Sequence, residues 1–307
     1  MKSLTLACLL SLAVTAAMSR EWTATDGRKL EADFVSATAD AVTVKRAADG
    51  QTFSIPLSGL SAADQDWVKE QMTKPAPAGK PIDGPFAELV TGEWALSEHD
   101  GLPFALFASK ELDASRKYPL VVSLHGRSQN TENGKQLGPF ARAFAEPKNY
   151  EKRPCIIFAP LGYQPWGGEG TAWSNEPGQK ALALIEELIE SLPIDEDRVY
   201  VCGHSMGGFG SCHFAVTEPK RFAAVVATSG CTGVSSADTF KRLPLWLHHA
   251  ADDAVVEVKY SRDLAEALKR SKTFKYTEYP TGGHGIAGQV FNDPAVHEWM
   301  FSQGVNE

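Results

Sequence analysis

The feature that most constrains the fold is an apolar run that ends in the pattern Gly-x-Ser-x-Gly. Residues 199–202 are apolar and suited to a strand, the pattern occupies residues 203–207 with Ser205 at its centre, and a helix-compatible stretch follows. Glycines on both sides of a serine permit a sharp turn, because a Cβ at either position would crowd it. The sequence therefore predicts a strand, a tight turn that carries Ser205, and a helix whose amino end faces that turn.

An acid and a histidine follow Ser205, each just after a predicted strand. Residues 243–250 are typical of a buried strand, with Asp252 and Asp253 in the loop behind it, and a last strand runs into a glycine-rich loop around His284. The order serine, aspartate, histidine is that of α/β-hydrolases, and open α/β sheets place their chemistry at the carboxyl ends of strands. We therefore interpret Ser205 as a nucleophile, His284 as its base and one of the two aspartates as the acid. The plainer interpretation of Ser205 is a helix N-cap.

From about residue 84 the chain alternates strand-like and helix-like segments. Buried parallel strands are predicted where apolar residues run together, at 118–124, 155–159 and 223–229. A helix is predicted over residues 178–192, and residues 193–197 are expected to break it before the strand that leads to Ser205. Such alternation predicts an α/β fold, a doubly wound and mostly parallel sheet with helices on both faces.

Backbone N–H groups near Ser205 are expected to form an oxyanion hole. One belongs to Met206, directly after the serine, and the other to Arg127 in the His-Gly loop that follows residues 118–124. His125 in the same loop is interpreted as a structural hydrogen-bonding group.

An aromatic loop is the candidate substrate-binding segment. Tyr163, Trp166 and Trp173 lie among glycines in a loop that leaves the carboxyl end of a strand. They are suited to form a platform for a sugar or aryl group, and packing within the wall of the site is the alternative. Only about a dozen residues separate Gly230 from the next strand, so we expect no large cap over the site.

The chain is expected to contain a signal peptide, a small module, a linker and a catalytic domain. Residues 1–19 combine a positive start, a short apolar stretch and small residues, which predicts a cleaved signal peptide and a secreted or periplasmic protein. An uncleaved anchor is the alternative. The proline-rich residues 73–84 predict a semi-rigid linker, and residues 85–307 the catalytic domain.

Residues 20–72 predict the small module. Short alternating runs are separated by turns such as Asp26-Gly27, and residues 61–64 are typical of a capping box that opens a short helix. We expect an SH3-like β-barrel closed by that helix. Arg-Glu-Trp-Thr at 20–23 with Phe34 resembles the Sla-type homology domain, of which only the fold is expected to carry over. An accessory adhesion or spacer role is favoured, and a stabilising cap is the alternative.

Net charge and cysteine spacing argue against nucleic-acid, metal and cofactor partners. A net charge of −8 gives no support for nucleic-acid binding, which favours a basic face. Four cysteines lie beyond the predicted signal peptide: Cys155, Cys202, Cys212 and Cys231. They could form disulfides or remain buried free thiols, and the sequence does not choose between the two. Their spacings match no zinc pattern, and His248 and His249 alternate in direction on a strand, so no metal site and no cofactor are expected.

Three segments together resemble a known family. Residues 194–200, the run Gly-His-Ser-Met-Gly-Gly-Phe-Gly at 203–210, and residues 219–225 look like bacterial esterases related to polyhydroxybutyrate depolymerases and to feruloyl and acetylxylan esterases of carbohydrate esterase family one, and like the "predicted peptidase" group. The resemblance implies an α/β-hydrolase with Ser205, Asp253 and His284 as its triad. The acid loop of that family usually reads His-Gly-x-x-Asp-x-x-Val, whereas this chain has His249-Ala250.

The expected function is that of a secreted serine carboxylesterase that acts through an acyl-enzyme, on esters such as acyl or feruloyl groups on a carbohydrate polymer. After signal cleavage we expect no membrane partner, and a monomer or weak oligomer. A serine peptidase of the prolyl-oligopeptidase-like type and a non-catalytic wall-binding protein are the alternatives.

Overall fold

The computed structural model describes residues 19–38, 40–73, 80–129, 132–162 and 176–305. The chain divides into two compact units, residues 1–79 and residues 80–307. None of the helices in the described ranges is long and apolar enough to cross a membrane. The predicted signal peptide lies almost wholly outside the described residues, and it stays a prediction.

The first unit is a four-stranded antiparallel sheet in the order β1-β2-β3-β4 with one α-helix. Its elements are β1 Ser19–Thr23, β2 Lys29–Ala37, β3 Ala41–Arg46, β4 Thr52–Pro56, η1 Leu57–Gly59 and α1 Ala62–Thr73. The predicted capping residue is in place, because Ser61 Oγ accepts a hydrogen bond from the Asp64 N–H at 3.2 Å. A single isolated bridge, Ala24 to Leu60, joins segments beyond the paired strands. The described sheet is not closed, and the predicted barrel is not confirmed.

The second unit contains a sheet of eight strands. The strands are β5 Ala95–His99, β6 Leu102–Phe107, β7 Tyr118–Leu124, β8 Ile156–Pro160, β9 Ile194–His204, β10 Ala224–Thr228, β11 Leu245–Ala250 and β12 Phe274–Tyr279. The α-helices are α2 Pro139–Ala145, α3 Pro147–Tyr150, α4 Glu176–Ser191, α5 Met206–Thr217, α6 Ala237–Phe240, α7 Val258–Leu268, α8 Ala287–Phe291 and α9 Pro294–Phe301. Short 3-10 helices are η2 Ala87–Leu89, η3 Arg127–Gln129, η5 Val234–Ser236 and η6 Gly283–Gly285.

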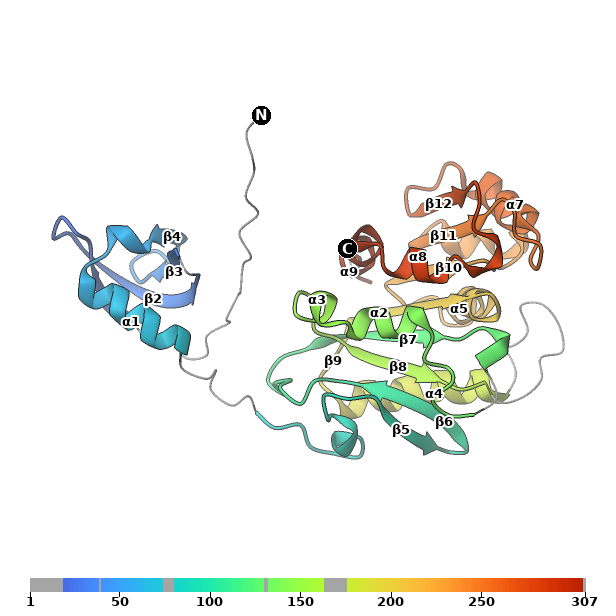
Figure 1. Cartoon of the computed structure of the whole chain (residues 1–307), viewed down its shortest axis with the longest axis horizontal. Helices are drawn as coiled ribbons and strands as arrows, with labels where there is room; N and C mark the ends of the chain where they lie inside the picture. The colour runs from blue at the N-terminus through green and yellow to red at the C-terminus, as the bar shows by residue number, and fades with distance from the viewer. Residues whose placement is uncertain (1–18, 39, 74–79, 130–131, 163–175, 306–307) are drawn as a thin grey trace. The chain divides into compact units, whose positions relative to one another are not determined.

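The sheet is mostly parallel, as predicted. Its order is β12-β11-β10-β9-β7-β8-β6-β5, with β12 and β5 at opposite edges (Figure 1). Neighbours from β12 to β8 pair in parallel, whereas β6 pairs with β8 and with β5 in antiparallel fashion. Consequently the carboxyl ends of β7, β9, β11 and β12 meet at one edge, where open α/β sheets carry their sites.

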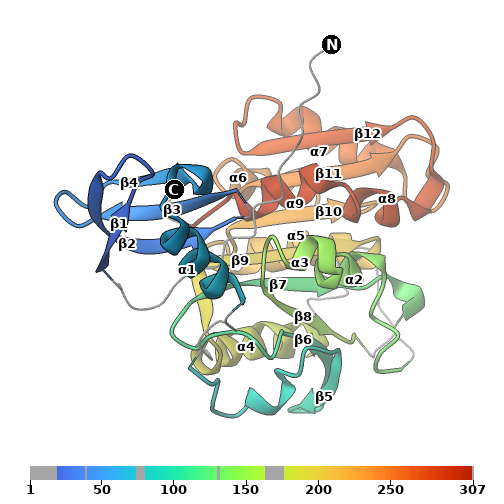
Figure 2. The same cartoon turned by 60° about the vertical axis from the view of Figure 1, so that its left-hand side comes forward.

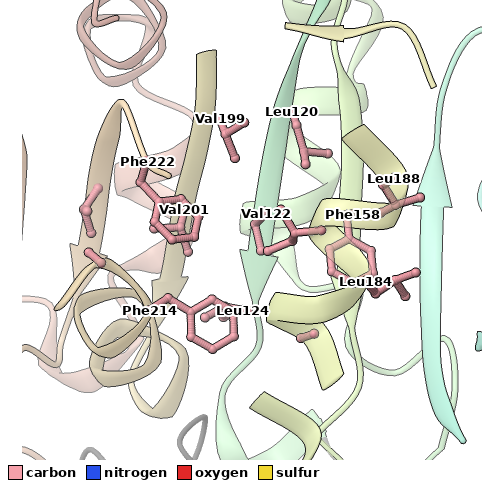
Figure 3. Packing of buried hydrophobic residues seen from close by; sticks show 14 of the residues in the cluster. Leu120, Val122, Leu124, Phe158, Leu184, Leu188, Val199, Val201, Phe214 and Phe222 are labelled. Carbon is pink, nitrogen blue, oxygen red and sulfur yellow. The ribbon is translucent and has the colours of Figure 1, made fainter. Parts of the chain in front are cut away.

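Helices cover both faces of the sheet. Successive strand residues point to opposite faces, and each face forms an apolar cluster with the helices that pack on it. On β7, Leu120, Val122 and Leu124 belong to the cluster under α4 to α7, and Val121 to the cluster under α2, α8 and α9. In the first cluster Leu184 and Leu188 of α4 lie beside Phe158 of β8 (Figure 3). On the other face α8 packs next to α2 (Figure 1, Figure 2).

Two sequence expectations about this unit are settled by the structure. The helix ends at Ser191, just before residues 193–197, as expected, but the strand that leads to Ser205 begins earlier than predicted, at Ile194. Ile194 pairs with Tyr118, and the Tyr118 N–H donates to the Pro193 carbonyl at 2.8 Å, so the neighbouring strand extends β9 backwards. All four described cysteines are buried free thiols.

Candidate active site

Ser205 lies at the junction of strand and helix that its sequence pattern predicts. β9 ends at His204 and α5 begins at Met206, with Ser205 between them. The backbone of Ser205 has a φ of 57°, a value that residues other than glycine rarely adopt. The glycines are required by close backbone contacts. A Cβ at Gly207 would lie 1.9 Å from the Leu124 carbonyl oxygen, and one at Gly203 would lie 2.4 Å from the Gly207 carbonyl oxygen. The turn is therefore pressed against the end of β7.

Gly207→Ala is expected to lower the free energy of unfolding by at least about 3 kcal/mol, because the methyl group would meet backbone rather than a movable side chain. Urea unfolding of the whole chain measures the loss. Gly288→Ala is the matched control, since a Cβ there meets nothing within 4 Å. Equal stability of the two variants would contradict the described contact.

The structure brings Ser205, His284 and Asp253 together. Ser205 Oγ lies 2.8 Å from His284 Nε2, and His284 Nδ1 lies 2.8 Å from Asp253 Oδ2. The three residues follow the carboxyl ends of β9, β12 and β11, respectively. The side chain of Asp253 is completely buried, while 22% of the His284 side chain is exposed. A reacting group can thus approach the serine and the histidine but not the acid.

Asp253 is an ionised acid with all its acceptor positions in use. Its Oδ1 accepts hydrogen bonds from the N–H groups of Val255 and Val256 at 2.8 and 3.0 Å. Burial favours the neutral carboxyl group, but the hydrogen bonds from His284 and from these two N–H groups outweigh it and lower the pKa of Asp253. His249, which the sequence did not single out as a partner of the acid, lies 3.1 Å from Asp253 Oδ2 through its Nε2. In the sequence, only its position four residues before Asp253 could have indicated this contact.

Asp252 has a different place from its neighbour. Its carboxylate accepts hydrogen bonds from the N–H groups of Gly282 and Gly283 at 3.3 and 2.7 Å. It therefore ties the loop after β11 to the loop that carries His284. The carbonyl of His284 accepts two further hydrogen bonds, from His204 Nε2 at 2.6 Å and from Ser229 Oγ at 3.3 Å.

The residues predicted for the oxyanion hole follow neighbouring strands. Leu124 pairs with Gly203 in the parallel ladder of β7 and β9, so Arg127 and Met206 leave the same sheet edge on adjacent strands. Arg127 opens η3 and is exposed. His125 is a structural hydrogen-bonding group, as predicted: its Nδ1 lies 2.7 Å from the Gly126 carbonyl, and the Gly162 N–H donates to its Nε2 at 2.9 Å. Tyr163, Trp166 and Trp173 lie outside the described residues.

Acid is expected to destabilise the fold between about pH 6.5 and pH 4. Burial lowers the pKa of His125 to about 4 and that of His248 to about 3, below the ordinary value near 6.5. In this window the unfolded chain binds protons on these rings and the folded chain does not, so the free energy of unfolding falls with pH. We expect a loss on the order of 5 kcal/mol between pH 7 and pH 4.5, with similar contributions from the two rings, measured by urea unfolding.

A control separates this effect from carboxylates. The lowered pKa of Asp253 makes its contribution disappear only as the pH falls below about 4, outside the window. His125→Asn keeps a donor toward Gly126 but cannot titrate, so it should be less stable at pH 7 and lose less toward pH 4.5. A flat profile of the wild-type chain between pH 7 and pH 4.5 would overturn the expectation.

Comparisons with known proteins agree with this fold. Residues 174–297 match the family described as Phospholipase/Carboxylesterase. Feruloyl esterase C of Emericella nidulans is 23% identical over 227 residues, which are 70% of this chain and 77% of that protein. A probable feruloyl esterase C of Aspergillus clavatus is 27% identical over 137 residues, 43% of this chain and 47% of that protein, so the chain spans about half the length of this relative.

A solved structure is also similar to this chain. The crystal structure of a thermostable esterase superimposes with a TM-score of 0.63 and 30% identity, over 69% of this chain and 63% of that one. Taken with the order and direction of the eight strands, this similarity supports an α/β-hydrolase fold for the second unit. The second unit is an α/β-hydrolase domain in which residues 174–297 match the Phospholipase/Carboxylesterase family.

Proposed function

We propose that the protein is a serine carboxylesterase whose catalytic triad is Ser205, His284 and Asp253. The observation that carries the proposal is the hydrogen-bonded series from Ser205 Oγ through the His284 ring to Asp253 Oδ2, with 2.8 Å at each step. Such a series activates a hydroxyl group for attack on a carbonyl.

The steps of the proposed ester hydrolysis follow from the hydrogen-bond partners of His284. Ser205 Oγ attacks the ester carbonyl while His284 Nε2 takes the hydroxyl proton, and the buried carboxylate of Asp253 stabilises the resulting imidazolium without taking the proton itself. The oxyanion would accept hydrogen bonds from the N–H groups of Met206 and Arg127. His284 then protonates the departing alcohol, which leaves an acyl-serine. A water molecule, deprotonated by His284, hydrolyses that ester and restores the serine.

An acyl or feruloyl group on a carbohydrate polymer is the substrate class that we favour. The segment between β10 and β11, residues 229–244, holds only η5 and α6, which leaves little chain to build a cap over the site. An open site admits the side group of a polymer, and two relatives that the chain resembles carry the name feruloyl esterase C. We further infer that Tyr163, Trp166 and Trp173 contact the aryl or sugar part of the substrate.

The remaining segments fit an exported enzyme. We infer that residues 1–19 direct secretion or periplasmic export, since they combine a positive start with an apolar stretch. Residues 20–72 would then act as an SH3-like accessory or spacer module, in addition to the catalytic domain.

The test is a substrate panel with the purified full chain. p-Nitrophenyl acetate, methyl ferulate, acetylated xylan, a polyester and a chromogenic peptide are compared under the same conditions, with the Ser205→Ala variant as the blank. We expect hydrolysis of p-nitrophenyl acetate and of at least one carbohydrate-linked ester. Peptide cleavage without ester cleavage would favour the peptidase alternative, and the absence of both hydrolysis and phosphonate labelling of Ser205 would favour the binding protein.

A further inference from the structure

His249 is a buried titratable group that the reaction described above does not use. It lies near the end of β11, and its side chain is completely buried, as is that of Asp253. Its Nε2 lies 3.1 Å from Asp253 Oδ2 and 3.1 Å from the Val256 carbonyl oxygen. A carboxylate and a carbonyl can only accept hydrogen bonds, so Nε2 must carry a proton.

The other ring nitrogen has the opposite character. Burial, the largest influence, lowers the pKa of His249, so the ring is neutral near pH 7 and its Nδ1 is an acceptor. Ser261 Oγ in α7 lies 2.6 Å from this nitrogen and donates to it. The thiol of Cys231, whose pKa burial raises to about 11, lies 3.8 Å from Ser261 Oγ and is available as a donor to it.

The series from Cys231 through Ser261 to His249 ends at the acid, with the Nε2 proton of His249 shared between Asp253 Oδ2 and the Val256 carbonyl oxygen. His249 donates to Asp253 Oδ2 from one side, and His284 donates to the same oxygen from the other. The backbone of the acid loop holds Oδ1. With both oxygens held, the carboxylate cannot rotate about its terminal bond without breaking several hydrogen bonds in a site that water does not reach.

We propose that His249 is a positioning residue, which fixes Oδ2 of Asp253 toward His284 and thereby sets the orientation of the catalytic imidazole. The proposal rests on the triad assigned above. The carboxylate would keep its backbone partners without His249, but Oδ2 would be held by His284 alone, and the acid and base would be free to tilt together. The chemical step should slow, while substrate binding should change little.

Two carboxamide variants separate the two ring nitrogens. In His249→Gln the side-chain NH2 is expected to reach the place of Nε2 and still donate to Asp253, whereas in His249→Asn it reaches only the place of Nδ1. We expect His249→Asn to lower kcat for p-nitrophenyl acetate by about 10- to 100-fold with KM within about twofold, and His249→Gln to recover most of that loss. Ser261→Ala leaves Nε2 facing its two acceptors and is expected to stay within about threefold of wild type.

The outcomes discriminate between positioning and packing. Equal losses in His249→Asn, His249→Gln and Ser261→Ala would show that only the packing of β11 against α7 matters, and unchanged kcat in His249→Asn would also overturn the proposal. The rate of phosphonate labelling of Ser205 provides the same comparison without an ester substrate, so failure of the substrate assignment leaves this test intact. Nitrogen NMR of wild-type protein labelled at histidine must find His249 neutral and protonated at Nε2; an Nδ1-protonated ring overturns the proposal even if no variant folds.

Discussion

Ser205→Ala is expected to lower kcat for p-nitrophenyl acetate by a factor on the order of 10⁶, because no other group on the described chain is placed to form the acyl-enzyme. Alanine lacks only the hydroxyl group, so the turn between β9 and α5 keeps its shape and the unfolding midpoint should hardly move. Steady-state kinetics with a burst measurement gives the size of the loss. The oxyanion hole and substrate binding remain, so activity should persist at roughly 10³ to 10⁴ times the rate in water.

The control for this variant is Ser235→Ala, which removes the same atom from an exposed residue of η5. It should retain full activity. A Ser205→Ala protein that hydrolyses esters within tenfold of wild type would remove Ser205 from the reaction and the triad with it.

Asp253→Asn is expected to lower kcat by a factor on the order of 10⁴ near pH 7. The amide carries no charge to stabilise the imidazolium, and it can pair with His284 in the wrong tautomer, which leaves a proton on the nitrogen that faces Ser205. Because His249 also faces this side chain, an amide in place of the carboxylate leaves at least one buried hydrogen bond unmade.

Asp252→Asn makes the same chemical change one residue earlier. The amide oxygen can keep the 2.7 Å hydrogen bond from the Gly283 N–H, and only the longer one from the Gly282 N–H is lost, so we expect a loss of less than about tenfold. Measuring kcat and KM of both variants decides which aspartate is the acid. A larger loss in Asp252→Asn than in Asp253→Asn would reverse the assignment.

The sequence was sufficient for the parts of the fold that depend on local pattern. The apolar run before Ser205 predicts a strand, and the glycines at 203 and 207 predict the turn, because both signals act within a few residues. The order of serine, acid and histidine likewise leads to one sheet edge once the strands are taken as parallel. The observed strand order and the position of His284 beside Ser205 follow that expectation.

Other features depend on contacts between distant segments, which no local pattern carries. The early start of β9 is caused by Tyr118 on the adjacent strand, and the contact of His249 with Ser261 requires α7 to pack on β11. The choice between Asp252 and Asp253 rested on family resemblance, since both lie in the same loop and only the folded chain separates their partners. Closure of the small sheet depends in the same way on pairing between its first and last segments.

The close approach of Gly207 to Leu124 has a consequence for recombination between related proteins. Because the helix after Ser205 lies against the backbone of β7 at Gly207, the two segments must fit each other closely, although more than 80 residues separate them in the chain. A chimera that imports residues 199–217 from a relative while keeping its own β7 should fold only if both parents share the same backbone path at residue 124. Chimeras that exchange both segments together should tolerate far more sequence difference.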